Sequence, residues 1–239
     1  MKYCEKAIIL AGGRGTRIQK AEPLLPKALI KVTDRPILHY IIIELMDNGV
    51  RDFYFCLGYM ASQIVDYVKS NFPSLNCVFF IENTPLGTGG TLLNAINSCE
   101  VGNYLVVNGD TFLSYDIRAF AEFHSKNQSS FSIVSVFKET PDRYGVMRFK
   151  GSCILEFCEK QQKESGWINA GHYLIYSQEF KRMVNSFGYR QTHSFSLEVF
   201  LEKLVDRHVL FGFKVESDFI DIGIPEDLNI ARKKFRWVD

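Results

Sequence analysis

The chain has 239 residues, of which 46% are hydrophobic and 23% charged, so it is long enough to bury a substantial core. Its 28 Lys and Arg against 27 Asp and Glu give a net charge of +1, which excludes a general attraction to nucleic acid or to an anionic membrane. Six cysteines are scattered without a CxxC pair, and the five histidines form no ligand-spaced cluster. We therefore expect buried free thiols in a reducing compartment.

The N-terminal segment has no signal-peptide pattern, because its apolar run at residues 7–10 is short and continues into glycines. The most apolar segment, residues 36–46, is interrupted by His39 and Glu44. It is also much shorter than the ~20 apolar residues that a membrane span needs. The sequence therefore predicts a cytoplasmic protein without membrane contact.

The first half of the chain alternates between strand-like and helix-like segments. Apolar runs typical of strands come at residues 7–11, 52–58, 76–81 and 103–110. Amphipathic segments between them predict helices over residues 36–48, 60–72 and 89–98. Strands that are apolar throughout are typical of a parallel sheet buried on both faces. The alternation therefore predicts an α/β fold with a doubly wound, mixed but mostly parallel sheet.

The pattern changes at about residue 131. Strand-like runs follow one another closely, with little helix between them, at residues 131–137, 144–149, 152–158 and 168–176. Helix-like segments return at residues 196–207 and 225–235. No repeat, low-complexity segment or linker interrupts the chain. We therefore expect a single domain over residues 1–239, with a first half (1–130) and a second half (131–239) that extends the sheet.

Three glycines within four residues, Gly12, Gly13 and Gly15, follow the first predicted strand. Ligands of parallel sheets bind at the carboxyl ends of the strands, and glycines there let backbone N–H groups approach a phosphate closely. Arg14 and Arg17 would add charge-assisted contacts to such an anion. For this loop taken alone, a tight turn without a ligand is the simpler alternative.

Two familiar phosphate-binding patterns do not fit this loop. A P-loop requires a Lys-Ser or Lys-Thr pair after its second glycine, and none follows here. The dinucleotide fingerprint requires a small residue three positions after Gly15, where this chain has Ile18. The loop therefore belongs to another type of phosphate site, or to none.

The glycine turn, with Lys27 ten residues after Arg17, resembles the signature of the sugar-1-phosphate nucleotidylyltransferases. Further motifs of that family follow in the same order: ENTPLGTGG (82–90), NGD (108–110), YGV (144–146), EK (159–160), NAG (169–171) and DIGIPEDL (221–228). Each motif alone is weak, but the ordered set covers almost the whole chain. The resemblance implies a Rossmann-like nucleotide-diphospho-sugar transferase fold. It also implies transfer of a nucleotidyl group from a nucleoside triphosphate to a sugar 1-phosphate, with release of pyrophosphate.

The same resemblance implies roles for individual residues. Arg17, Lys27 and Asp110 are the expected catalytic residues, of which Arg17 holds the triphosphate and Lys27 neutralises phosphate charge. Asp110 and Asp221 are the expected ligands of Mg²⁺, which prefers hard oxygen donors. A solvated lysine and turn aspartates are the ordinary alternatives. The expected nucleotide-binding residues are Leu10, Ala11, Gly12, Gly13, Arg14, Gly15, Thr16, Glu82, Gly87, Thr88 and Asn108.

The second half is expected to bind the sugar phosphate. Gly145 and Gly171 would let backbone groups approach sugar hydroxyls, while Glu159 and Asn169 would supply side-chain hydrogen bonds. Lys160 would hold the acceptor phosphate, unless Glu159 and Lys160 form an ordinary surface ion pair. The full expected set is Tyr144, Gly145, Glu159, Lys160, Asn169 and Gly171.

Glu82 stands five residues before Gly87, at a position where uridylyl- and thymidylyltransferases of the family tend to have Gln. A carboxylate can accept hydrogen bonds from both N1–H and the 2-amino group of guanine, so we expect GTP as the nucleotide. PLGTGG and INAGHYLI most resemble the D-glycero-α-D-manno-heptose 1-phosphate guanylyltransferases, which make GDP-heptose for bacterial surface polysaccharides such as capsule. A mannose-1-phosphate guanylyltransferase and a non-catalytic sugar-nucleotide sensor remain alternatives. The sequence does not determine the oligomeric state.

Overall fold

The computed structural model describes residues 4–16, 18, 22–141, 144–158, 165–190 and 192–234. Its strands are β1 (Lys6–Ala11), β2 (Asp52–Leu57), β3 (Asn76–Ile81), β4 (Asn103–Asn108), β5 (Thr111–Leu113), β6 (Phe131–Lys138), β7 (Val146–Lys150), β8 (Cys153–Cys158), β9 (Gly166–Tyr176), β10 (Leu210–Val215) and β11 (Phe219–Asp221). Its α-helices are α1 (Ile37–Asp47), α2 (Ala61–Asn71), α3 (Gly87–Ser98), α4 (Ile117–Lys126), α5 (Ser177–Ser186), α6 (Leu197–Leu204) and α7 (Pro225–Lys234). Two short 3₁₀ helices are η1 (Lys27–Leu29) and η2 (Val205–Arg207).

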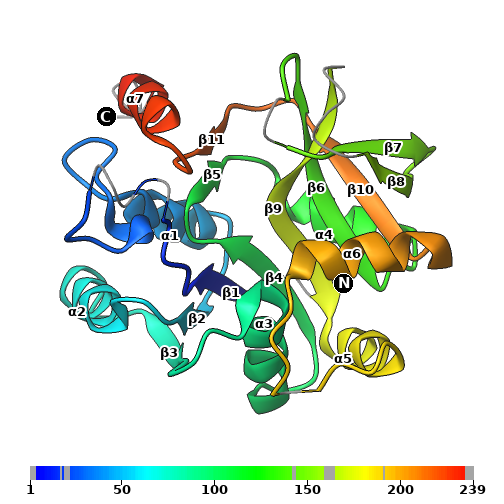
Figure 1. Cartoon of the computed structure of the whole chain (residues 1–239), viewed down its shortest axis with the longest axis horizontal. Coiled ribbons are helices and arrows are strands. Elements are labelled where there is room, and N and C mark those ends of the chain that lie inside the picture. The colour runs from blue at the N-terminus through cyan, green and yellow to red at the C-terminus, as the bar shows by residue number, and fades with distance from the viewer. Residues whose placement is uncertain are drawn as a thin grey trace.

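Among the described residues, a nine-stranded mixed sheet runs through both halves of the chain, in the order β3-β2-β1-β4-β9-β6-β10-β8-β7 (Figure 1). Strands β1 to β4 pair in parallel, as do β6 and β10. The β9 strand joins the halves by pairing antiparallel with both β4 and β6. The mostly parallel sheet expected from the sequence therefore describes the first half, whereas antiparallel pairing dominates around β7, β8 and β9.

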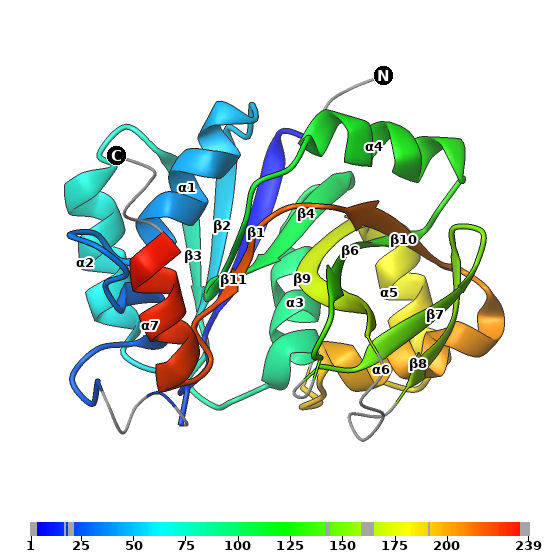
Figure 2. The same cartoon turned by 90° about the horizontal axis from the view of Figure 1, so that it is seen from above.

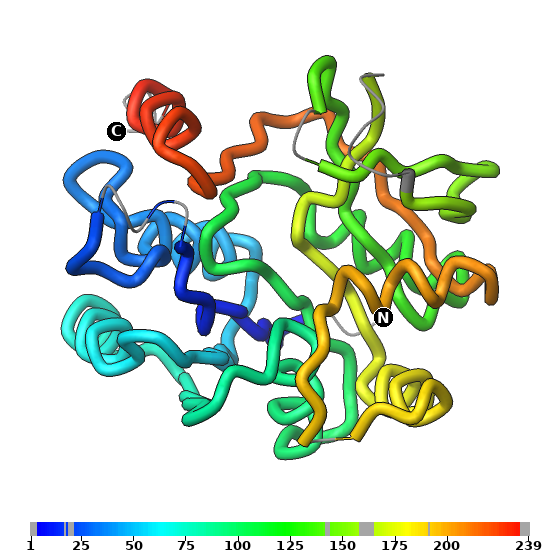
Figure 3. The backbone as a smooth tube through the Cα atoms, viewed as in Figure 1, coloured from blue at the N-terminus to red at the C-terminus, as the bar shows by residue number. Residues whose placement is uncertain are grey.

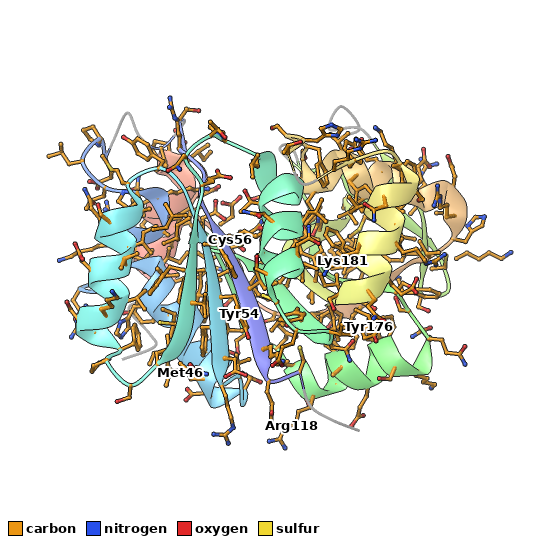
Figure 4. The ribbon with its side chains drawn as sticks, turned by 90° about the horizontal axis from the view of Figure 1, so that it is seen from below. Met46, Tyr54, Cys56, Arg118, Tyr176 and Lys181 are labelled. Atoms are coloured by element: carbon orange, nitrogen blue, oxygen red, sulfur yellow. The ribbon has the colours of Figure 1, made fainter. Side chains whose placement is uncertain are left out.

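The sheet is covered on both faces (Figure 2). Side chains of α1, α2, α4 and α7 belong to one buried cluster, together with Ala7 and Ile9 of β1. Side chains of α3, α5 and α6 belong to a second cluster, which includes Ile8 of β1. Tyr54 and Cys56, labelled on β2 in Figure 4, also contact this second cluster. Successive residues of a strand point to opposite faces, so one apolar run serves both clusters.

Most of the helices and strands of the structure were expected from the sequence, but two helices were not. The strands and helices expected up to residue 110 are all present, with shifts of one or two residues at their ends. The expectation of little helix between the strands of residues 131–176 is confirmed for the described residues, but α5, which follows them, was not predicted; its buried Phe180, Met183 and Val184 lie among polar residues. The helix α4 was also not predicted, although Asp116 accepts hydrogen bonds from the backbone of Arg118 and Ala119 at its start. Both helices are amphipathic, with buried Ile117 and Phe120 three residues apart in α4 and Met183 and Val184 three and four residues after Phe180 in α5, so the sequence does carry a helical period at both places.

The five cysteines whose side chains are described are free thiols, as predicted. Cys4 and Cys56 are buried, but Cys77, Cys99 and Cys153 are only partly buried, which corrects the expectation of general burial. Cys77 and Cys153 lie on β3 and β8, near the two edges of the sheet, where fewer side chains cover them. Within the described ranges, no helix is both long and apolar enough to cross a membrane.

The segment before α6 packs against the first turn of α3 and ties the two halves together. The carbonyl of Phe195 accepts hydrogen bonds from the N–H groups of Gly89 (3.0 Å) and Gly90 (3.3 Å), and the N–H of Phe195 donates to the carbonyl of Leu86. The Phe195 ring stacks on Tyr189, with ring centroids 4.3 Å apart. A Cβ atom at Gly89 would lie 2.2 Å from this ring, so only glycine fits beneath it.

We therefore expect Gly89→Ala to lower the free energy of unfolding by roughly 1–3 kcal/mol, because the added methyl group overpacks a buried contact. Urea unfolding followed by circular dichroism would measure this change. Gly102→Ala is the matched control: nothing lies within 4 Å of its added Cβ, so its stability should be nearly unchanged. Equal stability of the two variants would contradict the packing argument.

Candidate functional site

Two adjoining cavities lie where the two halves of the chain meet. The larger, of about 580 Å³, is lined mainly by the loop after β1 and the start of α3. The smaller, of about 230 Å³, is lined mainly by residues of the second half. Lys27, Asn108, Asp110 and Glu198 line both cavities. The shared wall suits a reaction in which a group passes from a ligand in one cavity to a ligand in the other.

Glycines allow the segments around this shared wall to approach one another. Gly15 has a φ angle of +59°, and a Cβ atom there would lie 3.1 Å from Cβ of Lys27. The N–H of Gly109 donates to the carbonyl of Leu10 at 2.9 Å, and its Cβ would lie 2.8 Å from Cβ of Ala11. Side chains at these two glycines would therefore push Lys27 and the turn after β4 away from the end of β1.

Lys27 lies between two carboxylates that come from distant parts of the sequence. Its ammonium group donates a hydrogen bond to Oδ2 of Asp110 and lies 3.6 Å from Oδ1 of Asp221. Burial disfavours the charged form of Lys27, but the two carboxylates outweigh burial and raise the pKa of Lys27 above its usual value. Lys27 therefore carries a full positive charge at neutral pH.

The Asp221 carboxylate is held in a defined orientation. Its Oδ1 accepts a hydrogen bond from the N–H of Gly223 at 2.7 Å, and its Oδ2 accepts one from the Tyr144 hydroxyl at 2.8 Å. Tyr144 was expected to bind the sugar phosphate. In this structure it lines the smaller cavity and also orients Asp221.

Asp110 and Asp221 are the expected ligands of a divalent cation. Asp110 and Asp221 converge on one positive charge, the Lys27 ammonium, so a cation is electrostatically favoured at this point. Among the described residues, no group of three or more His, Cys, Asp and Glu side chains could hold a metal. Mg²⁺ is commonly held by one or two carboxylates, with water and substrate phosphates completing its shell. The donor chemistry of this pair therefore fits Mg²⁺.

Glu82 lies at the floor of the larger cavity and makes contacts that the sequence did not reveal. Its Oε2 accepts hydrogen bonds from the N–H of Leu86, at 3.1 Å, and from the Thr91 hydroxyl. Its Oε1 lies 3.3 Å from where a Cβ atom at Gly12 would be. Oε2 is therefore already used within the protein and Oε1 is the oxygen nearer the glycine turn, while the expected pairing of guanine with this carboxylate stays a prediction.

In the smaller cavity, Asn169 is engaged with its own strand. Its Oδ1 accepts from the N–H of Gly171 and its Nδ2 donates to the Tyr173 hydroxyl, both at 2.9 Å. Gly171 has a φ angle of +74°, and a Cβ atom there would lie 2.5 Å from Nδ2 of Asn108. Asn169 therefore shapes the irregular part of β9 that contacts Asn108 of the first half, and retains one amide hydrogen for a ligand.

The structure places most of the expected site residues together. The larger cavity is lined by Leu10, Ala11, Gly12, Gly13, Arg14, Gly15, Lys27, Glu82, Gly87, Thr88, Asn108 and Asp110. The smaller is lined by Lys27, Asn108, Asp110, Tyr144, Gly145, Asn169, Gly171 and Asp221. Thr16 is exposed and lines neither cavity. The expected residues Arg17, Glu159 and Lys160 lie outside the described residues.

Residues 6–236 match the family described as "Nucleotidyl transferase". The chain belongs to that family. It is similar to two proteins named "D-glycero-alpha-D-manno-heptose 1-phosphate guanylyltransferase". The one from Aneurinibacillus thermoaerophilus is 30% identical over 233 residues, covering 97% of this chain and 98% of that protein. The one from Campylobacter jejuni is 33% identical over 227 residues, covering 93% of this chain and 96% of that protein.

A solved structure shares the fold of this nucleotidyl transferase. It is described as "Crystal structure of HddC from Yersinia pseudotuberculosis complexed with GMP-PN". It superimposes with a TM-score of 0.82 at 32% identity, covering 97% of this chain and 99% of that one. The family and the fold class expected from the sequence are therefore confirmed.

Glu198 is the main lining residue of this nucleotidyl transferase that the sequence did not indicate. Its Oε2 accepts hydrogen bonds from the Thr88 hydroxyl at 3.1 Å and the Ser196 hydroxyl at 2.5 Å. Thr88 in turn accepts from the N–H of Leu197 at 2.9 Å. Glu198 reaches the cavities only because α6 begins beside α3, and no local pattern in the sequence reports that contact.

His172 follows Gly171 on β9 and is fully enclosed, with Nδ1 lying 3.3 Å from the Tyr115 hydroxyl. Burial lowers the pKa of His172 from 6.5 to about 4. In the unfolded chain this imidazole binds a proton at a higher pH than in the folded protein. Folding therefore becomes less favourable as the pH falls from 6.5 towards 4.

When the pH is lowered from 6.5 to 5, the titration of His172 should lower the free energy of unfolding by about 2 kcal/mol. His172→Phe removes this titration, so its stability should fall less over the same interval, as measured by urea unfolding at both pH values. His208→Asn, which changes an exposed histidine, should keep the full decrease. An identical decrease in the wild type and His172→Phe would show that His172 does not titrate as described.

Proposed function

We propose that this chain transfers GMP from GTP to a sugar 1-phosphate of manno configuration, giving a GDP-sugar and pyrophosphate. The acceptor we favour is D-glycero-α-D-manno-heptose 1-phosphate. The observation that carries the proposal is the cluster of Lys27, Asp110 and Asp221 between two adjoining cavities. The names of the relatives support both the guanylyl group and the heptose acceptor.

The reaction requires two polyanions to approach each other. A phosphate oxygen of the sugar 1-phosphate attacks the α-phosphorus of GTP, a new P–O bond forms, and the bond to the β-phosphate oxygen breaks. The attacking oxygen is already ionised at neutral pH, so no general base is needed. The barrier comes from charge repulsion and alignment, which fixed positive charges and a defined pose reduce.

The larger cavity would hold GTP, with its phosphates against the backbone of Gly12, Gly13 and Gly15. The smaller cavity would hold the acceptor beside Gly145 and Gly171. Lys27 would then counter the negative charge that concentrates between the two phosphates in the transition state. Outside the described residues, Arg17 is proposed to hold the triphosphate, and Lys160, with Glu159, to hold the acceptor.

Asp110 and Asp221 are the residues that would hold Mg²⁺. When bound, Mg²⁺ would supply charge neutralisation and polarise phosphoryl oxygens. The hydrogen bonds that Tyr144 and Gly223 donate to Asp221 keep that carboxylate directed towards Asp110 and Lys27. Orientation of one carboxylate by its neighbours preserves the site while the ligands exchange.

Two alternatives to the proposed function are a mannose 1-phosphate acceptor and a sensor that binds sugar nucleotides without catalysis. Mannose 1-phosphate differs from the heptose acceptor at the far end of the sugar, away from the reacting phosphate. A non-catalytic sugar-nucleotide sensor would not require Lys27 together with two convergent aspartates, and all three are present. The favoured setting is the cytoplasm, where the product would supply capsule or other surface-polysaccharide synthesis.

We expect pyrophosphate release only with GTP and a manno-configured acceptor when four nucleoside triphosphates are each paired with heptose, mannose and glucose 1-phosphates. Activity should disappear with a chelator and return with Mg²⁺, because the Asp110 and Asp221 carboxylates add negative charge beside the phosphates, which Lys27 alone cannot offset. Higher kcat/KM for mannose 1-phosphate than for the heptose would select the mannose alternative. Binding without turnover of any pair would select the sensor.

We also propose that Oε1 of Glu82 accepts a hydrogen bond from the 2-amino group of guanine. Inosine triphosphate lacks the 2-amino group, so its kcat/KM should fall below that of GTP by an amount equivalent to roughly 1–3 kcal/mol for one unpaired acceptor. Glu82→Gln should lower the ratio of kcat/KM for GTP to kcat/KM for inosine triphosphate, because the neutral amide is a weaker acceptor. Glu198→Gln, which removes a second carboxylate from the larger cavity, should leave the ratio unchanged. Equal kcat/KM values for GTP and inosine triphosphate in the wild type would show that Glu82 does not recognise the base.

A further inference from the structure

The C-terminal helix α7 lies beside the segment that carries Lys27 (Figures 1 and 3). Arg232 of α7 makes two polar contacts with that segment. Its Nε donates to the carbonyl of Lys31 at 3.2 Å, and its Nη2 donates to Oε1 of Glu22 at 3.2 Å. These contacts join parts of the chain about two hundred residues apart in sequence.

The two contacts of Arg232 lie on either side of Lys27. Glu22 precedes Lys27 by five residues, and Lys31 follows it by four. One planar guanidinium group therefore holds both ends of a short irregular segment whose middle is η1. A guanidinium suits this task because its N–H donors have fixed directions, unlike those of an ammonium group.

The same helix also determines the position of Asp221. The β11 strand ends at Asp221, and α7 begins at Pro225. Leu228 and Ala231 of α7 are buried in the same cluster as Ala28 of η1. The relative placement of Lys27 and Asp221 therefore depends on how α7 packs against residues 22–31.

The Arg232–Glu22 pair contributes little to the free energy of unfolding, because its side chains are 42% and 35% exposed and water screens them. Its effect is on geometry. We propose that Arg232 is a positioning residue that holds residues 22–31 so that the Lys27 ammonium stays between Asp110 and Asp221. This inference rests on the proposed function insofar as Lys27 acts in nucleotidyl transfer.

The first test measures kinetics. Arg232→Ala should lower kcat roughly tenfold, because a small displacement of a reacting group is costly even when the mutation is remote. The KM values for GTP and sugar 1-phosphate should change little, since Arg232 contacts neither expected cavity. Lys234→Ala is the matched control: it removes a positive charge and an ion pair with Asp218 from the same helix and should retain full kcat.

A double-mutant comparison separates positioning from general loss of structure. Adding Arg232→Ala to Lys27→Ala should not slow the enzyme further, because the group that Arg232 positions is already absent. A structural defect would lower kcat by the same factor in both backgrounds. Glu22→Gln, which weakens one of the two contacts, should lower kcat by a smaller factor. It replaces Arg232→Ala in this experiment if that variant does not fold.

A second readout does not depend on activity. The ion pairs of Lys27 should protect its amine from acylation by acetic anhydride, and mass spectrometry should show several-fold faster labelling of Lys27 in Arg232→Ala than in the wild type. Unchanged labelling, or a kcat equal to that of the wild type, would overturn the inference. If no nucleotidyl transfer is found in the wild type, the proposed function fails, and the labelling experiment still decides whether Arg232 positions Lys27.

Discussion

The contacts of Lys27 with Asp110 and Asp221 are the interaction on which the arrangement of the cleft depends. Two carboxylates this close would repel each other unless a cation lay between them. The three residues come from η1, from the turn after β4 and from the end of β11. Their convergence therefore fixes three segments of the fold relative to one another and creates a local site for cations and phosphates in a chain of nearly zero net charge.

Close approaches at glycine join the segments around this cluster, within the first half and between the two halves. Gly109 brings the turn after β4 against the end of β1, and Gly171 brings β9 against Asn108. In the segment before α6, Phe195 covers Gly89 in the first turn of α3. In each case a side chain would occupy space already filled by another segment. The cleft thus depends on glycines that let neighbouring segments, and side chains such as Asn108 and Phe195, approach the backbone closely.

Several polar residues of the cleft first stabilise the protein itself. Tyr144 donates to Asp221, Asn169 bonds with Gly171 and Tyr173, and Glu82 uses Oε2 for Leu86 and Thr91. These internal bonds restrict side-chain rotation before a ligand arrives, which lowers the entropic cost of binding. They also leave fewer atoms for ligands than residue type alone suggests. A motif residue can therefore contribute to a site by shaping it, and not only by contacting the substrate.

The sequence by itself determined the first half of the sheet, the place of the glycine turn and the membership of a transferase family. It could do so because apolar periodicity and ordered motifs are local properties that short-range physics controls. The prediction did not include α4 or α5, although buried apolar residues recur at helical spacing in both, nor the antiparallel pairing of β9 with β4 and β6. The contacts of Glu198 with Thr88, and of Arg232 with Glu22 and Lys31, were decided only by the tertiary structure. They join segments more than a hundred residues apart, and their geometry depends on how whole helices pack against the sheet.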